Sequence, residues 1–173
     1  PGERHDRARG GAVWRGGPLS RACCVSRLQL KPGKEKSLLR RHPWIYASAV
    51  GRIDGNPGAG ETVEVRGADG RLLAWAAYSA ESSIRARAWS FAEGTRVTAE
   101  LLAERVRLAV QRRAALASDT TAARLVFGEA DGLPGLIVDR YADQLVTQFQ
   151  AAGVDAWRDV LIDALLAATD CRD

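Results

Sequence analysis

A series of short strand patterns, separated by turn-forming residues, constrains the fold of this 173-residue chain more than any other feature. Residues 61–66 alternate between polar and apolar side chains. They lead through Asp69-Gly70, a dipeptide typical of a hairpin turn, to an apolar run at 71–78. Further strand patterns occupy residues 27–30, 44–53 and 84–91. Together with one short helix, they predict a small β-barrel-like domain over residues 25–92 in a chain of the α+β class.

The stretch from Lys34 to Tyr46 is rich in cations and aromatic rings. Pro43 disfavours the helical conformation in the residue before it, so a short helix is predicted over residues 36–41, followed by a strand. A basic edge beside aromatic side chains suits a nucleic acid, because it can contact both phosphates and bases. The alternative is a solvated capping helix with an arginine-rich end.

A second basic face lies in the strand pattern at 84–91. Successive side chains of a strand point to opposite faces, so Arg85, Arg87 and Trp89 share one face while small apolar residues share the other. This face suits an RNA backbone with a stacking platform, and a solvated sheet face with two extended arginines is the alternative. The candidate RNA-binding residues are therefore Lys36, Arg40, Arg41, Trp44, Arg85, Arg87 and Trp89.

The net charge of +4 is distributed unevenly along the chain. Residues 1–52 carry twelve Lys/Arg against three Asp/Glu, residues 53–117 nine against eight, and residues 118–173 four against ten. This gradient predicts that a polyanion binds the N-terminal half. The apolar runs are too short to span a membrane, and the three cysteines form no disulfide framework. We therefore expect a cytoplasmic protein that does not bind membranes.

The remaining segments divide the chain further. Residues 1–24 are rich in Gly and Arg without an apolar period, which predicts either disorder or a non-native extension. Residues 93–121 are predicted as a connecting helix with Thr98 at its N-cap. Residues 122–173 contain three strand patterns and one amphipathic helix, which bury little apolar surface by themselves. They are therefore predicted to form an incomplete α/β domain whose partner strand lies beyond Asp173.

Several side chains are of types that occur in active sites, but they do not form a catalytic or metal-binding motif. Glu129, Asp131 and Asp139 lie among turn-forming residues, which favours structural roles over acid–base catalysis, and Asp139 could pair with Arg140. Cys171 has no base near it in the sequence, and the histidines fit no metal-ligand spacing. No glycine-rich loop opens a helix as in a nucleotide-binding motif. We therefore expect no metal site and no catalytic residue in this chain.

Three stretches resemble the bacterial S-adenosylmethionine-dependent methyltransferases that form 5-methylcytosine in large-subunit ribosomal RNA, the large subunit methyltransferase I type. The stretches are residues 34–44, 77–89 and 128–140, and the resemblance extends over about residues 25–169. It implies an N-terminal PUA domain for RNA, a small middle α/β domain and a C-terminal Rossmann-like domain. That third domain would begin beyond residue 173. It would bind the S-adenosylmethionine cofactor and carry a cysteine nucleophile, which none of this chain's cysteines matches.

The resemblance implies that this chain is the RNA-recognition portion of such a methyltransferase. It would bind ribosomal RNA weakly and transfer no methyl group by itself, and a homodimer is left open. A complete, non-catalytic PUA-type RNA-binding adaptor is the alternative function.

Overall fold

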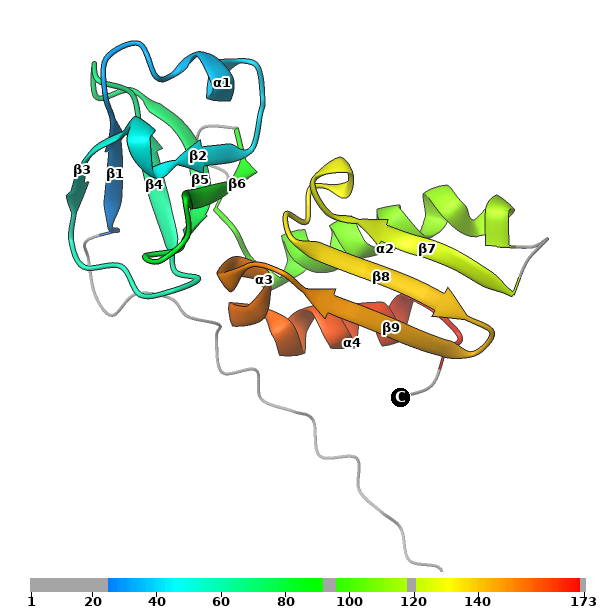
Figure 1. Cartoon of the computed structure of the whole chain (residues 1–173). Helices are drawn as coiled ribbons and strands as arrows, with labels where there is room; N and C mark the ends of the chain where they lie inside the picture. The colour runs from blue at the N-terminus through cyan, green and yellow to red at the C-terminus, as the bar shows by residue number, and fades with distance from the viewer. Residues whose placement is uncertain (1–24, 92–95, 118–120, 172–173) are drawn as a thin grey trace, which may run out of the picture.

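The computed structural model describes residues 25–91, 96–117 and 121–171 and shows two β-sheets next to each other (Figure 1). The first sheet has six strands and curls into a half-barrel, and the second has three strands with helices on one face. The α+β class is therefore confirmed. Residues 1–24, predicted to be disordered or non-native, lie outside the described residues. No helix in the described part of the chain is long and apolar enough to cross a membrane.

The six-stranded sheet contains the predicted hairpin. Its strands, in the spatial order β2-β6-β5-β4-β1-β3, are β2 Trp44–Tyr46, β6 Ile84–Ser90, β5 Leu72–Tyr78, β4 Thr62–Arg66, β1 Arg27–Leu30 and β3 Val50–Asp54. Strands β4 and β5 are antiparallel, and the turn between them is closed by Gly67, whose N–H donates to the carbonyl of Arg71 at 2.9 Å. Gly70 adopts a φ of 81°, which a glycine tolerates without strain. The Asp69-Gly70 signal is thus confirmed.

Strand β5 is apolar along its length because both of its faces are covered. Ala74, Ala76 and Tyr78 lie in the core inside the curled sheet. Trp75 and Ala77 point to the other face and join a second core, which contains the three-stranded sheet and its helices. The prediction of a central strand is confirmed, since β5 pairs with β4 on one side and β6 on the other.

The predicted helix at 36–41 and the predicted strand at 44–53 are both shorter than expected. Helix α1 spans Lys36–Leu39, because Arg41 adopts the left-handed conformation with a φ of 61°. The strand is divided by a 3-10 turn, η1 Ala47–Ala49, into β2 and β3. These two strands lie at opposite ends of the sheet, so one continuous strand could not form both.

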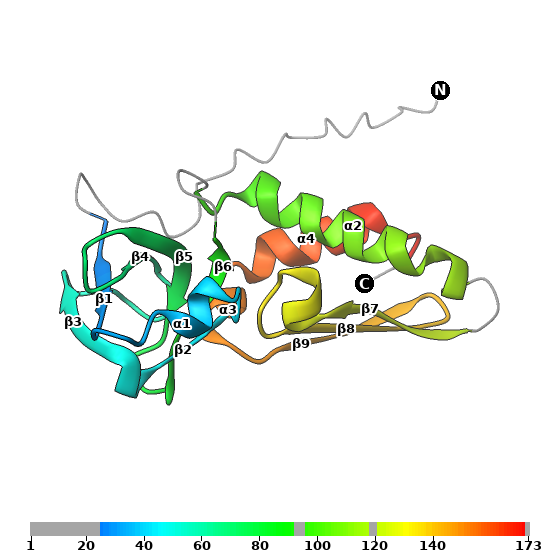
Figure 2. The same cartoon turned by 90° about the horizontal axis from the view of Figure 1, so that it is seen from above.

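The second unit is a three-stranded antiparallel sheet in the order β7-β8-β9. Its elements are α2 Ala99–Ala117, β7 Ala122–Phe127, η2 Gly128–Asp131, β8 Leu136–Tyr141, β9 Gln144–Phe149, α3 Ala152–Ala156 and α4 Arg158–Ala168. Helices α2 and α4 lie together on one face of the sheet (Figure 2). The hydroxyl of Thr98 accepts a hydrogen bond from the N–H of Leu101 at 3.3 Å, which confirms the predicted N-cap. Helix α2, predicted as a connection, contributes Leu102 and Val106 to the core.

The second of the two cores is shared by the two sheets. Trp75, Ala77 and Trp89 of the half-barrel belong to the same buried cluster as the apolar residues of α2, α4 and the second sheet. Helix α3 makes the closest approach, because Gly153 packs directly on Ala77 and Trp89. A Cβ atom at position 153 would lie 3.0 Å from Cζ2 of Trp89, so only glycine fits this position without a shift of its neighbours.

Candidate nucleic-acid interface

The candidate interface is formed by α1, the turn after it, and strands β2 and β6. The register pairs Trp44 with Arg87 and Ile45 with Ala86. Residues directly opposite each other point to the same face, so Trp44 and Arg87 lie on the outer face while Ile45 and Ala86 enter the core. The turn after α1 is held against β6, because the N–H of Ala88 donates to the carbonyl of Pro43 at 2.8 Å. Two predicted segments far apart in the sequence are therefore adjacent.

The cations of α1 and the turn after it are exposed, and none of them pairs with a carboxylate in the part of the chain that the structure describes. Lys36, Arg40 and Arg41 make no ion pair with any described residue, and Arg41 lies 5.9 Å from the ring centroid of Phe91. Arginines elsewhere are different, because many of them pair with a nearby carboxylate. The paired ones are Arg27, Arg52, Arg66, Arg107, Arg112, Arg113, Arg124 and Arg158. Lys36, Arg40 and Arg41 are thus not engaged in ion pairs with the described residues.

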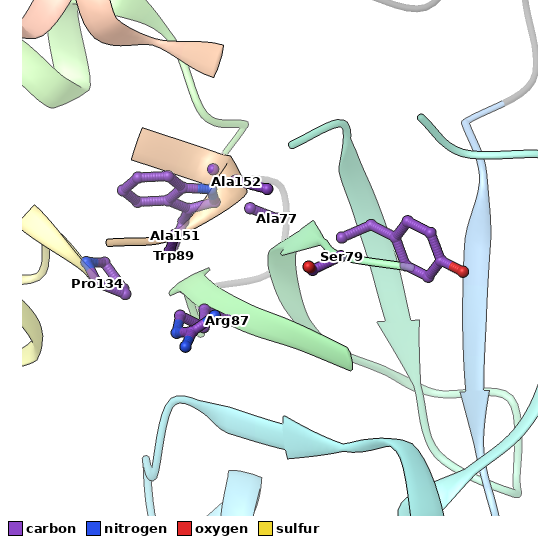
Figure 3. A pocket seen from close by; sticks show the side chains of 9 residues that line it. Ala77, Ser79, Arg87, Trp89, Pro134, Ala151 and Ala152 are labelled. Carbon is purple, nitrogen blue, oxygen red and sulfur yellow. The ribbon is translucent and has the colours of Figure 1, made fainter. Parts of the chain in front are cut away.

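The two arginines of β6 are half-buried. Arg85 donates from Nη1 to the carbonyl of Ser79 at 3.4 Å. Arg87 has no carboxylate partner among the described residues and lines a shallow hollow between β6 and α3 (Figure 3). Pro134 and Ala151 lie on the other side of this hollow, and the space between the side chains does not admit a water molecule. Arg87 can therefore contact a ligand only from the outside of the hollow.

The prediction that Trp89 stacks on RNA is wrong. Its side chain is on the same side of β6 as Arg87, as strand alternation requires, but only 3% of the residue is exposed. Helix α3 covers the outer face at this point, and Gly153 packs on the indole. Alternation along a strand indicates the face on which a side chain lies. It does not indicate which part of that face another unit covers.

Trp44 is half-exposed, and its indole N–H donates a hydrogen bond within the protein. Nε1 donates to Oε1 of Glu129 at 2.8 Å, which connects β2 to η2 of the second unit. The backbone N–H of Trp44 donates to Nδ1 of His42 at 3.3 Å, and the two rings meet edge to face with centroids 5.6 Å apart. Trp44 is therefore held in place on the outer face beside the unpaired cations.

The three carboxylates considered for catalysis have structural partners. Asp131 is 7% exposed and accepts hydrogen bonds from the N–H of Phe127 at 2.7 Å and from Arg113 at 3.0 Å. Asp139 pairs with Arg124 at 2.8 Å, and this contact lowers the pKa of Asp139 below its ordinary value. The structural interpretation of these residues is supported.

The predicted pairing of Asp139 with Arg140 is wrong. Neighbouring side chains in a strand point to opposite faces, so Asp139 and Arg140 in β8 diverge. Asp139 instead lies directly across from Arg124 of β7 in the strand register. A cross-strand partner of this kind can be identified only when the register is known.

A hollow of about 170 Å³ lies between α1, β2 and η1, and no pattern in the sequence predicts it. Its apolar floor is made by residues of the half-barrel core, and polar or aromatic side chains surround it. The lining residues are Leu30, Lys34, Ser37, Leu38, Trp44, Ile45, Tyr46, Ser48 and Ala49. Tyr46 is two residues from Trp44 in β2 and therefore shares its face, which is the signal that could have identified it.

Neither of the two hollows described above has the volume of a pocket for S-adenosylmethionine. Pockets for drug-sized molecules have volumes of about 300–1,000 Å³, and the hollow beside α1 is smaller. The hollow beside Arg87 admits no water. No group of three or more potential metal ligands occurs among the described residues, and Cys171 is free and half-buried.

Comparison with known proteins identifies residues 28–91 as a PUA-like domain. The chain is 46% identical over 141 residues to a protein of Shewanella amazonensis named ribosomal RNA large subunit methyltransferase I, which covers 80% of this chain and 36% of that protein. A protein of the same name from Aeromonas hydrophila is 45% identical over 140 residues, with 80% of this chain and 35% of that protein covered. The chain thus spans just over a third of the length of these relatives.

Solved structures show the same fold. A Streptococcus mutans protein described as a SAM-dependent methyltransferase superposes with a TM-score of 0.70 at 18% identity, over 84% of this chain and 38% of that chain. A second structure, described as a methyltransferase in complex with SAH, superposes with the same TM-score and identity. At this identity the similarity shows the fold alone. It confirms that the half-barrel and the second sheet occur together in another protein.

Proposed function

We propose that this chain, a relative of the ribosomal RNA large subunit methyltransferase I proteins over four-fifths of its length, is the RNA-recognition portion of an enzyme of that family. The enzyme would form 5-methylcytosine in large-subunit ribosomal RNA with S-adenosylmethionine as the methyl donor. Its surroundings would be the cytoplasm, where ribosomal RNA is available. The PUA-like domain supports RNA binding as the contribution of these residues.

One observation carries this proposal: several cations that have no carboxylate partner among the described residues gather at α1, the turn after it and β6. Phosphates supply most of the affinity in protein–nucleic acid complexes, and Lys and Arg side chains supply the contacts. A cation already paired with a carboxylate must lose that partner before it binds a phosphate. Lys36, Arg40, Arg41 and Arg87 need no such exchange with any described residue, so they are the phosphate contacts that we propose.

The methyl transfer itself would take place in a part of the protein outside these 173 residues. The relatives are almost three times as long as the aligned region, and neither of the two hollows described above has the volume of a cofactor pocket. We infer that a Rossmann-like domain holds the cofactor and the nucleophile, and that this chain alone binds RNA without methylating it. A homodimer is a further proposal, and sedimentation of the purified chain tests it.

RNA binding is tested with the full 173-residue chain and a fragment of large-subunit ribosomal RNA, measured at several salt concentrations. The Arg40→Glu/Arg41→Glu double variant should bind more weakly, and its salt slope should fall by about two units because two phosphate contacts are lost. The matched control is Arg52→Glu/Arg107→Glu, which changes the net charge equally at two exposed, ion-paired arginines. Equal weakening in both variants would contradict the proposed site.

A further inference from the structure

The hollow between α1, β2 and η1 lies beside the exposed cations Lys34 and Lys36 of the candidate interface. Its floor is formed by Leu30, Leu38 and Ile45, none of which is more than 4% exposed. Its rim carries Lys34 and the exposed ring of Tyr46. An apolar floor with aromatic and cationic side chains at the rim matches the chemistry of one nucleotide, which combines a flat ring with a phosphate.

We propose that this hollow is a subsite for a single unpaired nucleobase, with Tyr46 as the stacking residue and Lys34 as the contact to the adjacent phosphate. This inference rests on the proposed RNA-binding function and adds Tyr46 and Lys34 to the proposed RNA contacts. The volume of about 170 Å³ is below the range of pockets for drug-sized ligands, so one ring system fits better than a longer segment.

Tyr46 is better suited to stacking than the other aromatic residues of the interface. Its exposed fraction is 46%, whereas Trp89 is covered by α3 and Trp44 is held by Glu129. The rings of Tyr46 and Trp44 stand at 84° with centroids 6.4 Å apart, so a flat base can stack on only one of them. Base–aromatic stacking depends little on base identity, so the subsite should accept different bases.

The cations around the hollow support the same assignment. Lys34 is exposed and makes no ion pair with a described residue. Lys31 donates from Nζ to the carbonyl of Ser48 at 3.0 Å, which holds η1 in place as one wall. The hollow is therefore structured by its own contacts, and its phosphate-binding cation remains available.

The test compares two polyanions that differ in having bases: a single-stranded oligouridylate and inorganic polyphosphate. The Tyr46→Ala variant of the full chain should bind the oligouridylate about tenfold more weakly. Its salt slope and its affinity for polyphosphate should stay unchanged, because no charge is removed. Lys34→Gln should lower the salt slope by about one unit for both ligands. The matched control is Tyr141→Ala, which removes another exposed tyrosine, 53% exposed on the second sheet, and should change neither affinity.

A second variant is needed because Tyr46→Ala could weaken binding through a loss of folding. Ser37→Phe places a ring in the hollow, keeps the contact between Tyr46 and Trp44, and should also weaken oligouridylate binding selectively. If both variants bind the oligouridylate as the Tyr141→Ala control does, the nucleobase subsite is overturned while the RNA-binding function stands. If the unmodified chain binds oligouridylate no better than Arg40→Glu/Arg41→Glu does, the proposed function fails and the subsite fails with it.

Discussion

The indole N–H of Trp44 donates a hydrogen bond of 2.8 Å to the carboxylate of Glu129, although the two residues are 85 positions apart in the chain. Trp44 belongs to the edge strand of the half-barrel, and Glu129 belongs to η2 of the second unit. This bond joins the candidate RNA-binding face to the second sheet from outside the shared core. It also occupies the polar group of an aromatic side chain that an RNA base could otherwise contact.

We expect Glu129→Ala to lower the free energy of unfolding by about 1 kcal/mol. This is the usual net contribution of one hydrogen bond. Urea-induced unfolding of the purified chain measures this change. Glu104→Ala is the control, because Glu104 is an exposed carboxylate on α2 whose partner, Arg107, lies on the same helix. A loss equal in the two variants would contradict a specific role of the Trp44 contact.

Asp131→Ala should destabilise the chain strongly, by about 3 kcal/mol. The Asp131 side chain is 3% exposed and pairs with Arg113 at 2.9 Å, so its removal leaves a largely buried guanidinium and the N–H of Phe127 without their acceptor. Thermal unfolding followed by circular dichroism checks this. Asp155→Ala, at an exposed pair with Arg158, should change the free energy of unfolding by less than about 1 kcal/mol.

Gly153→Ala should destabilise the contact between α3 and the half-barrel by about 1–3 kcal/mol, the usual effect of overpacking a core. The added methyl group would press on Ala77 and on the ring of Trp89. Unfolding in urea measures the loss, and the fluorescence of the buried indole should change with it. Gly58→Ala is the control, because the nearest atom to an added Cβ is 4.0 Å away, on Glu61. Equal stability of the two variants would show that α3 can shift without loss.

The ion pair of Asp139 predicts a specific pH dependence. The hydrogen bond from Arg124 lowers the pKa of Asp139 below its ordinary value of 3.8, so the pair stabilises the folded chain while the carboxylate is charged. The stabilisation should be fully present above the ordinary pKa and should be lost as the pH falls through the lower, folded-state pKa.

The Asp139→Asn variant measures this contribution. It should be less stable than the unmodified chain by no more than about 1 kcal/mol at neutral pH, because Arg124 is partly exposed. The difference should disappear in acid. A difference that stayed constant from neutral pH to the acid transition would assign the effect to something other than titration of Asp139.

Local patterns in the sequence predicted local structure well. The Asp69-Gly70 turn, the central strand β5 and the Thr98 cap all depend on residues within a few positions of one another. The failures at Trp89 and Asp139 have a common cause, because both residues are placed by contacts between distant segments. Trp89 is covered by α3, more than sixty residues later, and Asp139 finds Arg124 through strand register.

In the candidate site, too, the local features were predicted and the features that depend on distant segments were not. The clustering of unpaired cations near Trp44 followed from composition and strand alternation, and the pairing of Trp44 with Arg87 brings the two predicted segments together. The hollow beside Tyr46 could not be predicted, since one of its walls is η1, which interrupts the expected strand. Backbone irregularities of this kind are determined by the whole sheet and leave no clear periodic signal.

The core shared by the two sheets has a geometric consequence for a bound RNA. Because Trp75, Ala77 and Trp89 pack with the second unit, the half-barrel cannot rotate against it without opening a buried apolar contact. The half-barrel and the second unit should therefore move together as one rigid body. An RNA held by α1 would lie at a constant distance and angle from the second sheet, and every nucleotide along it would have a set position relative to that sheet. A target nucleotide would then be selected by its distance along the RNA from the bound phosphates.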